Sequence, residues 1–163
     1  KMRYALTIGL DKPATFTLRF RAPSWSAKTA FRFSSGEQSS VTNAGYVAFT
    51  KEWKDGDQVE VVFEDKVKEH IVDSHVAYTY GPLALARDVR FADGDLSERV
   101  RRGDVTFESI SAPDASMYAA FGAFMKMGVH DNPPRPISFC DYASAGSTRD
   151  GKSFYRVWLP IAE

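Results

Sequence analysis

Apolar side chains recur at every second position along most of the chain, and this periodicity constrains its fold more than any other feature. Phe16, Leu18 and Phe20, for example, alternate with Thr17 and Arg19. Successive side chains of a β-strand point to opposite faces of a sheet, so this pattern predicts a strand with one face in a core and the other in water.

The same alternation predicts strands along the rest of the chain, separated by turns rich in glycine, proline and aspartate. The expected strands are 4–10, 16–20, 31–33, 46–50, 59–63, 67–72, 76–80, 83–86, 105–110, 119–129, 137–140 and 154–159. Segment 119–129 has the alanine and methionine content of a helix, but its apolar residues repeat at period two. Gly122 and Gly128 would also weaken a helix by about 1 kcal/mol each, so we predict a strand. The run 132–136 holds three prolines, and we expect no regular structure there.

These elements predict an all-β protein: an antiparallel, jelly-roll-like β-sandwich, built either as one unit or as two packed β lobes. Between 91 and 104 charged and glycine residues replace apolar ones, which indicates a surface loop or a junction. We therefore expect a sandwich core region in 1–90, and the remaining strands, 105–163, in the same lobe or a second one. The sequence starts directly in a strand pattern with no leader, so we expect a fragment of a longer protein.

Composition and charge exclude several classes of function. The 21 lysine and arginine residues balance the 21 aspartate and glutamate residues, so no global field would attract nucleic acid or an anionic membrane surface. No apolar run approaches the ~20 residues of a membrane span. We expect neither nucleic acid nor a membrane as a partner. Cys140 is the single cysteine, so the chain can form no internal disulfide and no multi-cysteine zinc site.

The residues that could carry chemistry each have a plainer structural interpretation. The three histidines lack a metal-ligand pattern, and we expect no metal and no cofactor. The Asp-Gly-Asp runs at 55–57 and 93–95 could supply the paired carboxylates of glycoside hydrolysis, but Asp-Gly is first of all turn chemistry. Cys140 has no histidine as a local neighbour, so it is expected to be a small buried core residue rather than a nucleophile.

Five segments, taken in order, resemble one family. They are LRFRAPSW at 18–25, GY followed by KEWKDGDQV at 45–59, VAYTYGPL at 76–83, CDYASAG at 140–146 and YRVWL at 155–159. All are similar to motifs in the C-terminal β region of bacterial proteins like the β-L-arabinofuranosidases of glycoside hydrolase family 127. The resemblance covers residues 3–90 well and 137–160 fairly, whereas 91–136 match little.

The resemblance implies that catalysis and the accessory role belong to different domains. Catalysis in such enzymes belongs to an (α/α)6 barrel, where a zinc-held cysteine acts as nucleophile beside glutamates. Cys140 alone cannot build that site, so no catalytic residue carries over and the chain is expected not to be an enzyme by itself. It corresponds instead to a non-catalytic accessory β-sandwich domain, whose partner is the catalytic barrel of the parent glycoside hydrolase. A periplasmic, secreted or cytoplasmic location in a bacterium is left open.

A carbohydrate-binding module is the alternative function, because exposed aromatic side chains stack on sugar rings. Trp25, Tyr142 and Asp141 are the candidate substrate-binding residues, and Trp53 and Tyr78 are further aromatic candidates. Trp53 precedes a Gly-Asp turn, however, and is better interpreted as pinning that turn to the sheet.

Two expectations concern the end of the chain. Trp158 lies in an apolar strand and is expected in the core. The loop 141–151 combines Tyr142 with small residues that allow close backbone approach, which suits a loop laid against another domain. An ordinary long hairpin connection explains the same loop equally well.

Overall fold

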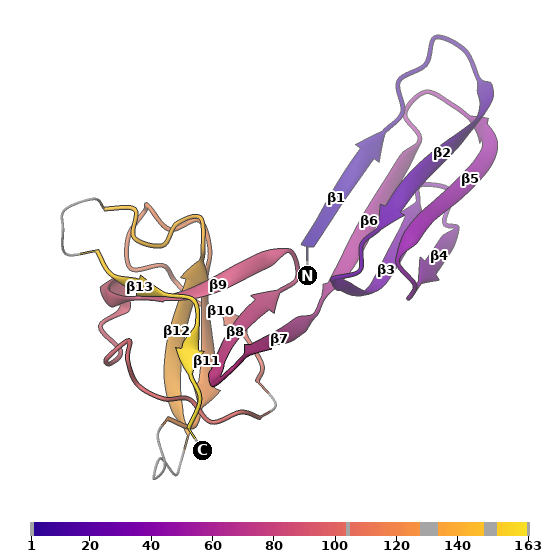
Figure 1. Ribbon diagram of the computed structural model, residues 1–163. Helices are drawn as coiled ribbons and strands as arrows, with labels where there is room; N and C mark the ends of the chain where they lie inside the picture. The colour runs from indigo at the N-terminus through magenta and orange to yellow at the C-terminus, as the bar shows by residue number, and fades with distance from the viewer. Residues whose placement is uncertain (1, 104, 128–133, 149–152, 163) are drawn as a thin grey trace. The chain divides into compact units, whose positions relative to one another are not determined.

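The computed structural model describes residues 2–103, 105–127, 134–148 and 153–162. Contacts between Cα atoms divide the chain into two compact units, Lys1–Lys66 and Val67–Glu163. Both units are built from antiparallel strands, and the expectation of an all-β fold is confirmed (Figure 1). Within the described ranges, the chain has no helix that is long and apolar enough to cross a membrane.

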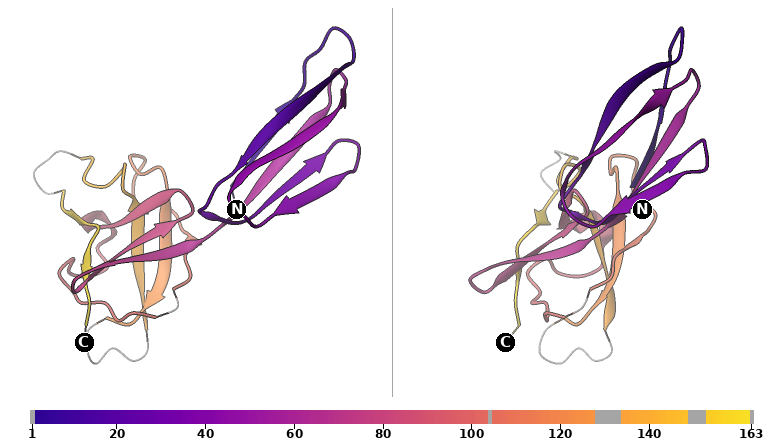
Figure 2. Two further views of the ribbon diagram at one scale, coloured as in Figure 1. Left: turned by 45° about the vertical axis from the view of Figure 1, so that its right-hand side comes forward. Right: turned by 90° about the vertical axis from the view of Figure 1, so that its right-hand side faces the viewer.

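The first unit is a sandwich of two sheets. The four-stranded sheet has the order β1 (Met2–Thr7), β6 (Gln58–Asp65), β3 (Ser26–Phe33) and β4 (Gln38–Val41). The second sheet pairs β2 (Ala14–Ala22) with β5 (Gly45–Trp53) along their full length. Within each of these two sheets, the paired strands run side by side in both views of Figure 2.

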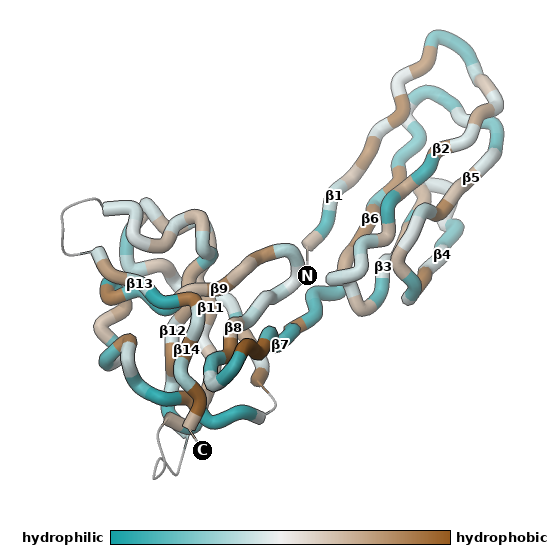
Figure 3. The backbone as a smooth tube through the Cα atoms, in the orientation of Figure 1, coloured by the Kyte–Doolittle hydropathy of each residue, from teal (hydrophilic) through white to brown (hydrophobic). Residues whose placement is uncertain are grey.

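Aromatic rings fill the space between these two sheets. Phe31 of β3 is fully buried, and its ring centroid lies 5.5 Å from that of Phe20 on β2 and 5.1 Å from that of Phe49 on β5. Apolar and polar residues alternate along the strands that face each other (Figure 3). The apolar residues of 16–20 and 59–63 belong to this one core, although Phe16 and Leu18 are only half-buried. β2 has a neighbour on one side only, which leaves part of its inner face open.

The second unit is one curled sheet with two short additions. Its central strands have the order β10 (Glu108–Ser109), β11 (Ala120–Met125), β12 (Arg135–Asp141), β9 (Leu83–Asp88), β8 (His75–Tyr80) and β14 (Leu159–Pro160). β7 (Val67–Val72) pairs with β8, and β13 (Tyr155–Arg156) pairs with β9. A 3-10 helix, η1 (Val89–Phe91), follows β9 directly.

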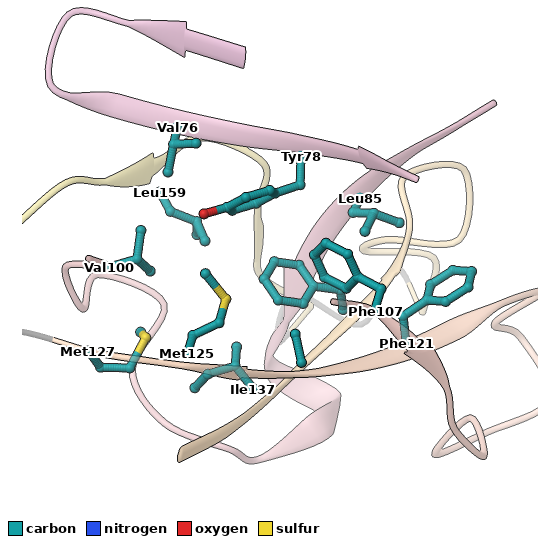
Figure 4. Close-up of a cluster of buried hydrophobic side chains, with 12 residues drawn as sticks. Val76, Tyr78, Leu85, Val100, Phe107, Phe121, Met125, Met127, Ile137 and Leu159 are labelled. Carbon is teal, nitrogen blue, oxygen red and sulfur yellow. The ribbon is translucent and has the colours of Figure 1, made fainter. Parts of the chain in front are cut away.

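The core of the second unit lies inside this curl. Figure 4 shows buried side chains from β8, β9, β11, β12 and β14 meeting there. The Phe107 ring stands edge-on to Phe139 at 5.2 Å and to Tyr78 at 5.7 Å. Val100, from the long connection after η1, is also fully buried and donates its N–H to the Pro160 carbonyl. The connection is therefore anchored to the sheet at this residue.

Most expected strands are present, and several differ in extent. Residues 120–125 form a strand and not a helix, as predicted, while the end of the expected segment lies outside the described residues. The expected strand 105–110 is reduced to Glu108–Ser109, and the expected strand 154–159 is divided into β13 and β14 by a bend at Val157 and Trp158. β4 is a strand that the sequence pattern did not indicate.

The expectation that residues 132–136 hold no regular structure is wrong at Arg135 and Pro136, which begin β12. Proline lacks an N–H, but the Ser138 N–H, two residues on, points away from β11 and donates to the Asp93 carboxylate. Backbone N–H groups two residues apart in a strand point to the same side. An N–H at position 136 would therefore face away from β11, as that of Ser138 does. β9 pairs with β12 only at Cys140 and Asp141, so the proline breaks no ladder hydrogen bond.

The division between the two units falls at Lys66 and Val67, inside the region 1–90 that the sequence presents as one core. The described part of 91–104 holds no strand apart from isolated bridges at Val100. The domain limits that we drew from the sequence stay a prediction, and we describe each unit by itself.

Candidate functional site

Three exposed aromatic side chains line one open groove of the second unit. Tyr142, Tyr155 and Trp158 are 51%, 44% and 41% exposed. The groove has a volume of about 600 Å³, and its other lining residues are His75, Ala84, Arg156 and Val157. This volume falls in the range of about 300–1,000 Å³ that is typical of small-molecule sites.

Contacts with β9 and the bend before β14 bring these aromatic residues together. β12 ends at Asp141, and the Tyr142 N–H then donates to the Ala84 carbonyl of β9 at 2.8 Å. Tyr155 pairs with Asp88 of β9 through β13. The bend between β13 and β14 then directs Trp158 to the same groove.

Gly146 fixes the place of the Tyr155 ring. Its φ of +67° lies in the left-handed region, and a Cβ added there would lie 2.7 and 2.8 Å from two ring carbons of Tyr155. Glycine is therefore the residue that allows both the turn and the close approach of the ring. The Tyr142 and Tyr155 rings meet edge to face at 5.9 Å, and the neighbouring Tyr142 side chain raises the pKa of Tyr155.

A buried ion pair holds the turn that carries Tyr142. Arg90 of η1 donates from Nε and Nη2 to the two carboxylate oxygens of Asp88, at 2.9 and 2.8 Å. Nη2 also donates to the Ser144 carbonyl at 2.7 Å, and the Gly146 N–H donates to Asp88 at 2.9 Å. Burial alone would raise the pKa of Asp88, but the hydrogen bonds from Arg90 and Gly146 outweigh it and lower that pKa.

Asp141, one of the candidate binding residues, lies beneath this turn. It is 4% exposed, and its carboxylate accepts hydrogen bonds from the Ser144 N–H at 3.0 Å, the Ser144 hydroxyl at 2.6 Å and the Ala119 N–H at 3.1 Å. These contacts hold the turn that carries Tyr142. Tyr142 itself, the second candidate, is exposed in the groove.

The other aromatic candidates lie elsewhere. Trp25 belongs to the first unit, where its half-buried ring packs 5.0 Å from Phe63. Trp53 is fully buried, donates from Nε1 to the Phe16 carbonyl at 3.0 Å, and so pins the end of β5 to β2 as expected. Tyr78 is 1% exposed in the second core. Stacking of Trp53 or Tyr78 on a sugar is therefore excluded, because neither ring has a free face.

Cys140 is a buried core residue, as the sequence indicated. Burial raises the pKa of its thiol to about 12, and the nearby carboxylates of Asp88 and Asp141 add to this effect. A thiol held in its protonated form is a poor nucleophile.

The two Asp-Gly-Asp runs also act structurally. Asp57 accepts from the Lys54 N–H within the turn between β5 and β6, where Gly56 has a φ of +81°, and Asp55 accepts from the Leu10 N–H of the loop between β1 and β2. Asp93 forms an ion pair of 3.1 Å with Arg87, whose side chain is fully buried, and Asp95 accepts from the Ser97 N–H two residues on. The turn interpretation is confirmed at 55–57.

The histidines fall in separate places. His70 on β7 lies 3.1 Å from the Thr79 hydroxyl, His75 lines the groove, and His130 lies outside the described residues. Among the residues that the structure describes, no group of three His, Cys, Asp or Glu side chains could hold a metal ion.

The expectation that Trp158 is a core residue is wrong, and Tyr155 was not singled out at all. Trp158 lies in the bend that divides the expected strand, so the alternation on which the expectation rested does not extend to it. Leu159, the first residue of β14, is fully buried, whereas Trp158 is exposed in the groove.

Residues 1–64 match the family model described as the middle domain of GH127 β-L-arabinofuranosidase. No curated protein matches the chain. The fold is similar to that of Ara127N-Se, a GH127 β-L-arabinofuranosidase from Geobacillus stearothermophilus T6, with a TM-score of 0.74 and 19% identity. It is also similar to the GH127 β-arabinofuranosidase BT3674, with a TM-score of 0.73 and 18% identity.

These similarities extend over 98% of this chain but only 28% and 30% of the two enzymes, so the chain spans less than a third of their length. A structure described as a glycoside hydrolase has a TM-score of 0.73 and 21% identity, over 99% of this chain and 30% of its own. The matched model is a middle domain, and the C-terminal placement that the motifs implied stays a prediction.

Proposed function

We propose that this chain is a non-catalytic accessory β region of a multi-domain glycoside hydrolase related to the family 127 β-L-arabinofuranosidases. The match of residues 1–64 to the middle-domain model carries the proposal. The fold similarity over nearly the whole chain, but a small part of each enzyme, supports it. In this role the chain packs against a catalytic barrel and supplies no reacting group.

The state of the chemistry-bearing side chains supports the non-catalytic part of the proposal. The only thiol is buried with a raised pKa. The carboxylates of Asp55, Asp57 and Asp93 are engaged in turns or an ion pair. Paired carboxylates that act as acid and base in glycoside hydrolysis face a shared substrate space, and these do not.

β1 supplies a surface suited to the barrel. It is an edge strand of its sheet, and Met2, Tyr4 and Leu6, on one face of it, are 43%, 44% and 37% exposed. An uncovered edge strand with an apolar row invites pairing or packing by other chains. Contact with another region of the parent protein buries this apolar row and so prevents such association.

Complex formation tests the proposal. The chain and the remainder of its parent protein are produced separately and mixed, and binding is measured by calorimetry. We expect a one-to-one complex that is weakened at least tenfold by Tyr4→Ser combined with Leu6→Ser, since about 1.4 kcal/mol of lost apolar contact corresponds to that factor.

Tyr46→Ser is the matched control, because Tyr46 is an aromatic residue of the same unit with 73% exposure. It should leave binding unchanged. A parent gene that encodes no helical-barrel region would contradict the proposal, as would a chain that shows no affinity for the remainder of the protein.

A further inference from the structure

We propose that the groove between β9, β13 and the turn after β12 binds a sugar ring of a carbohydrate chain, with Tyr142, Tyr155 and Trp158 as its aromatic walls. This goes beyond the accessory role, which needs only contact with a barrel. It assigns the second unit a ligand of its own.

The side chains around the groove match the chemistry of a sugar. A sugar ring has an apolar C–H face that stacks on aromatic rings, and a rim of hydroxyl groups that need hydrogen-bond partners. Tyr142, Tyr155 and Trp158 each combine an apolar ring with one polar tip. His75 and Arg156 add further polar groups to the lining.

The walls are held in place before any ligand arrives. The Tyr155 ring lies against Gly146, and the turn that carries Tyr142 is tied down by Asp141 from below and by the Asp88–Arg90 ion pair. A site whose side chains are already ordered loses less conformational entropy on binding. This support explains why so many buried polar contacts gather beneath one exposed turn.

The lining also offers hydrogen-bond donors to the rim of a sugar. Among the described residues that line the groove there is no carboxylate, and the Arg156 guanidinium has only donors, which the hydroxyl oxygens of a sugar can accept. A groove of about 600 Å³ has room for a sugar ring.

Nuclear magnetic resonance tests the site on the whole chain labelled with ¹⁵N. The probes are an arabino-oligosaccharide and a cello-oligosaccharide; the choice of the first rests on the proposed function, and that of the second does not. We expect saturable shifts at the Trp158 indole N–H and at the backbone N–H groups of Tyr142 and Arg156, with at least one of the two probes.

Variants then assign the binding to the groove. Tyr142→Ala and Trp158→Ala should each weaken binding by about two- to tenfold, the range expected for the loss of one aromatic contact. Tyr118→Ala is the matched control, because Tyr118 is 87% exposed in the same unit and does not line the groove. Thermal unfolding of each variant confirms that the fold is retained.

Two results would overturn the inference: no saturable shift at millimolar concentrations of either sugar, or binding that Tyr142→Ala and Trp158→Ala weaken no more than Tyr118→Ala does. Slower amide exchange around Tyr142 when the barrel is added, without any sugar binding, would assign the groove to domain contact instead. The accessory role is tested by complex formation through β1, so the two proposals can fail independently.

Discussion

Removal of the Arg90 side chain is expected to destabilise the second unit strongly. Its side chain is 11% exposed, and the side chain of its partner Asp88 is fully buried. Arg90→Leu would remove both hydrogen bonds to the Asp88 carboxylate, together with the bond to the Ser144 carbonyl. Asp88 would then keep only the N–H groups of Gly146 and of residue 90 as donors.

The cost follows from leaving a buried carboxylate without its counter-charge. Breaking a buried pair by removing one partner costs about 3–5 kcal/mol, a large share of the ~5–15 kcal/mol that stabilises a typical domain. Arg102→Leu is the control, because the Arg102–Glu69 pair is more exposed, with 54% of the arginine side chain and 25% of the glutamate side chain accessible. Exposed pairs contribute about 0–1 kcal/mol.

The assay is urea unfolding of the whole chain, with amide signals of the second unit as the readout. Arg90→Leu should lower the free energy of unfolding of that unit by several times the effect of Arg102→Leu. Asp88→Asn added to Arg90→Leu should recover part of the loss, because it removes the unpaired charge. Equal effects of the two arginine variants would refute the reasoning.

Three further predictions follow from burial and charge. Phe31→Ala should destabilise the first unit by about 3–5 kcal/mol, whereas Thr17→Ala, on the exposed face of β2, should cost less than about 1 kcal/mol; similar losses in urea unfolding would mean that the register is wrong. The folded-state pKa of Asp88 lies below its unfolded value. The ionised carboxylate therefore stabilises the fold above about pH 4, and this stabilisation is lost as the pH falls through the folded pKa. When the melting temperature is measured against pH, the Asp88→Asn variant should lose less thermal stability in acid than the natural chain does. Cys140 should react with a thiol reagent only as fast as the second unit opens, and rapid labelling of the folded chain would contradict its burial.

The sequence pattern identifies the strands wherever one side of the sheet is buried and the other is wet. β2 and β6 are such strands, because their more buried and more exposed residues alternate as the two faces of a sandwich sheet require. The pattern fails where tertiary contacts replace it. Pro136 is tolerated in β12 because an aspartate from a distant loop, and not a strand, faces that side. Nothing in the local run of prolines contains this information.

The candidate site was predictable in part for the same reason. Tyr142 stands out as an aromatic residue in a loop of small residues, a purely local signal. Tyr155 and Trp158 join it only because β13 and β14 pair with residues that lie 67 to 85 positions earlier in the chain. Asp141 lies under the site because the turn after β12 needs its carboxylate as an acceptor. Such long-range pairing is not visible in single-sequence periodicity.

The central claim, that the chain is accessory to catalysis performed elsewhere in its parent, is tested most directly by an activity assay. The purified chain and the full-length parent are compared on an aryl β-L-arabinofuranoside under the same conditions. We expect the parent to hydrolyse this arabinofuranoside and the chain alone not to hydrolyse it. Turnover by the chain alone that Cys140→Ser abolishes would contradict the account, because the only thiol of the chain would then be a nucleophile and not a buried core residue.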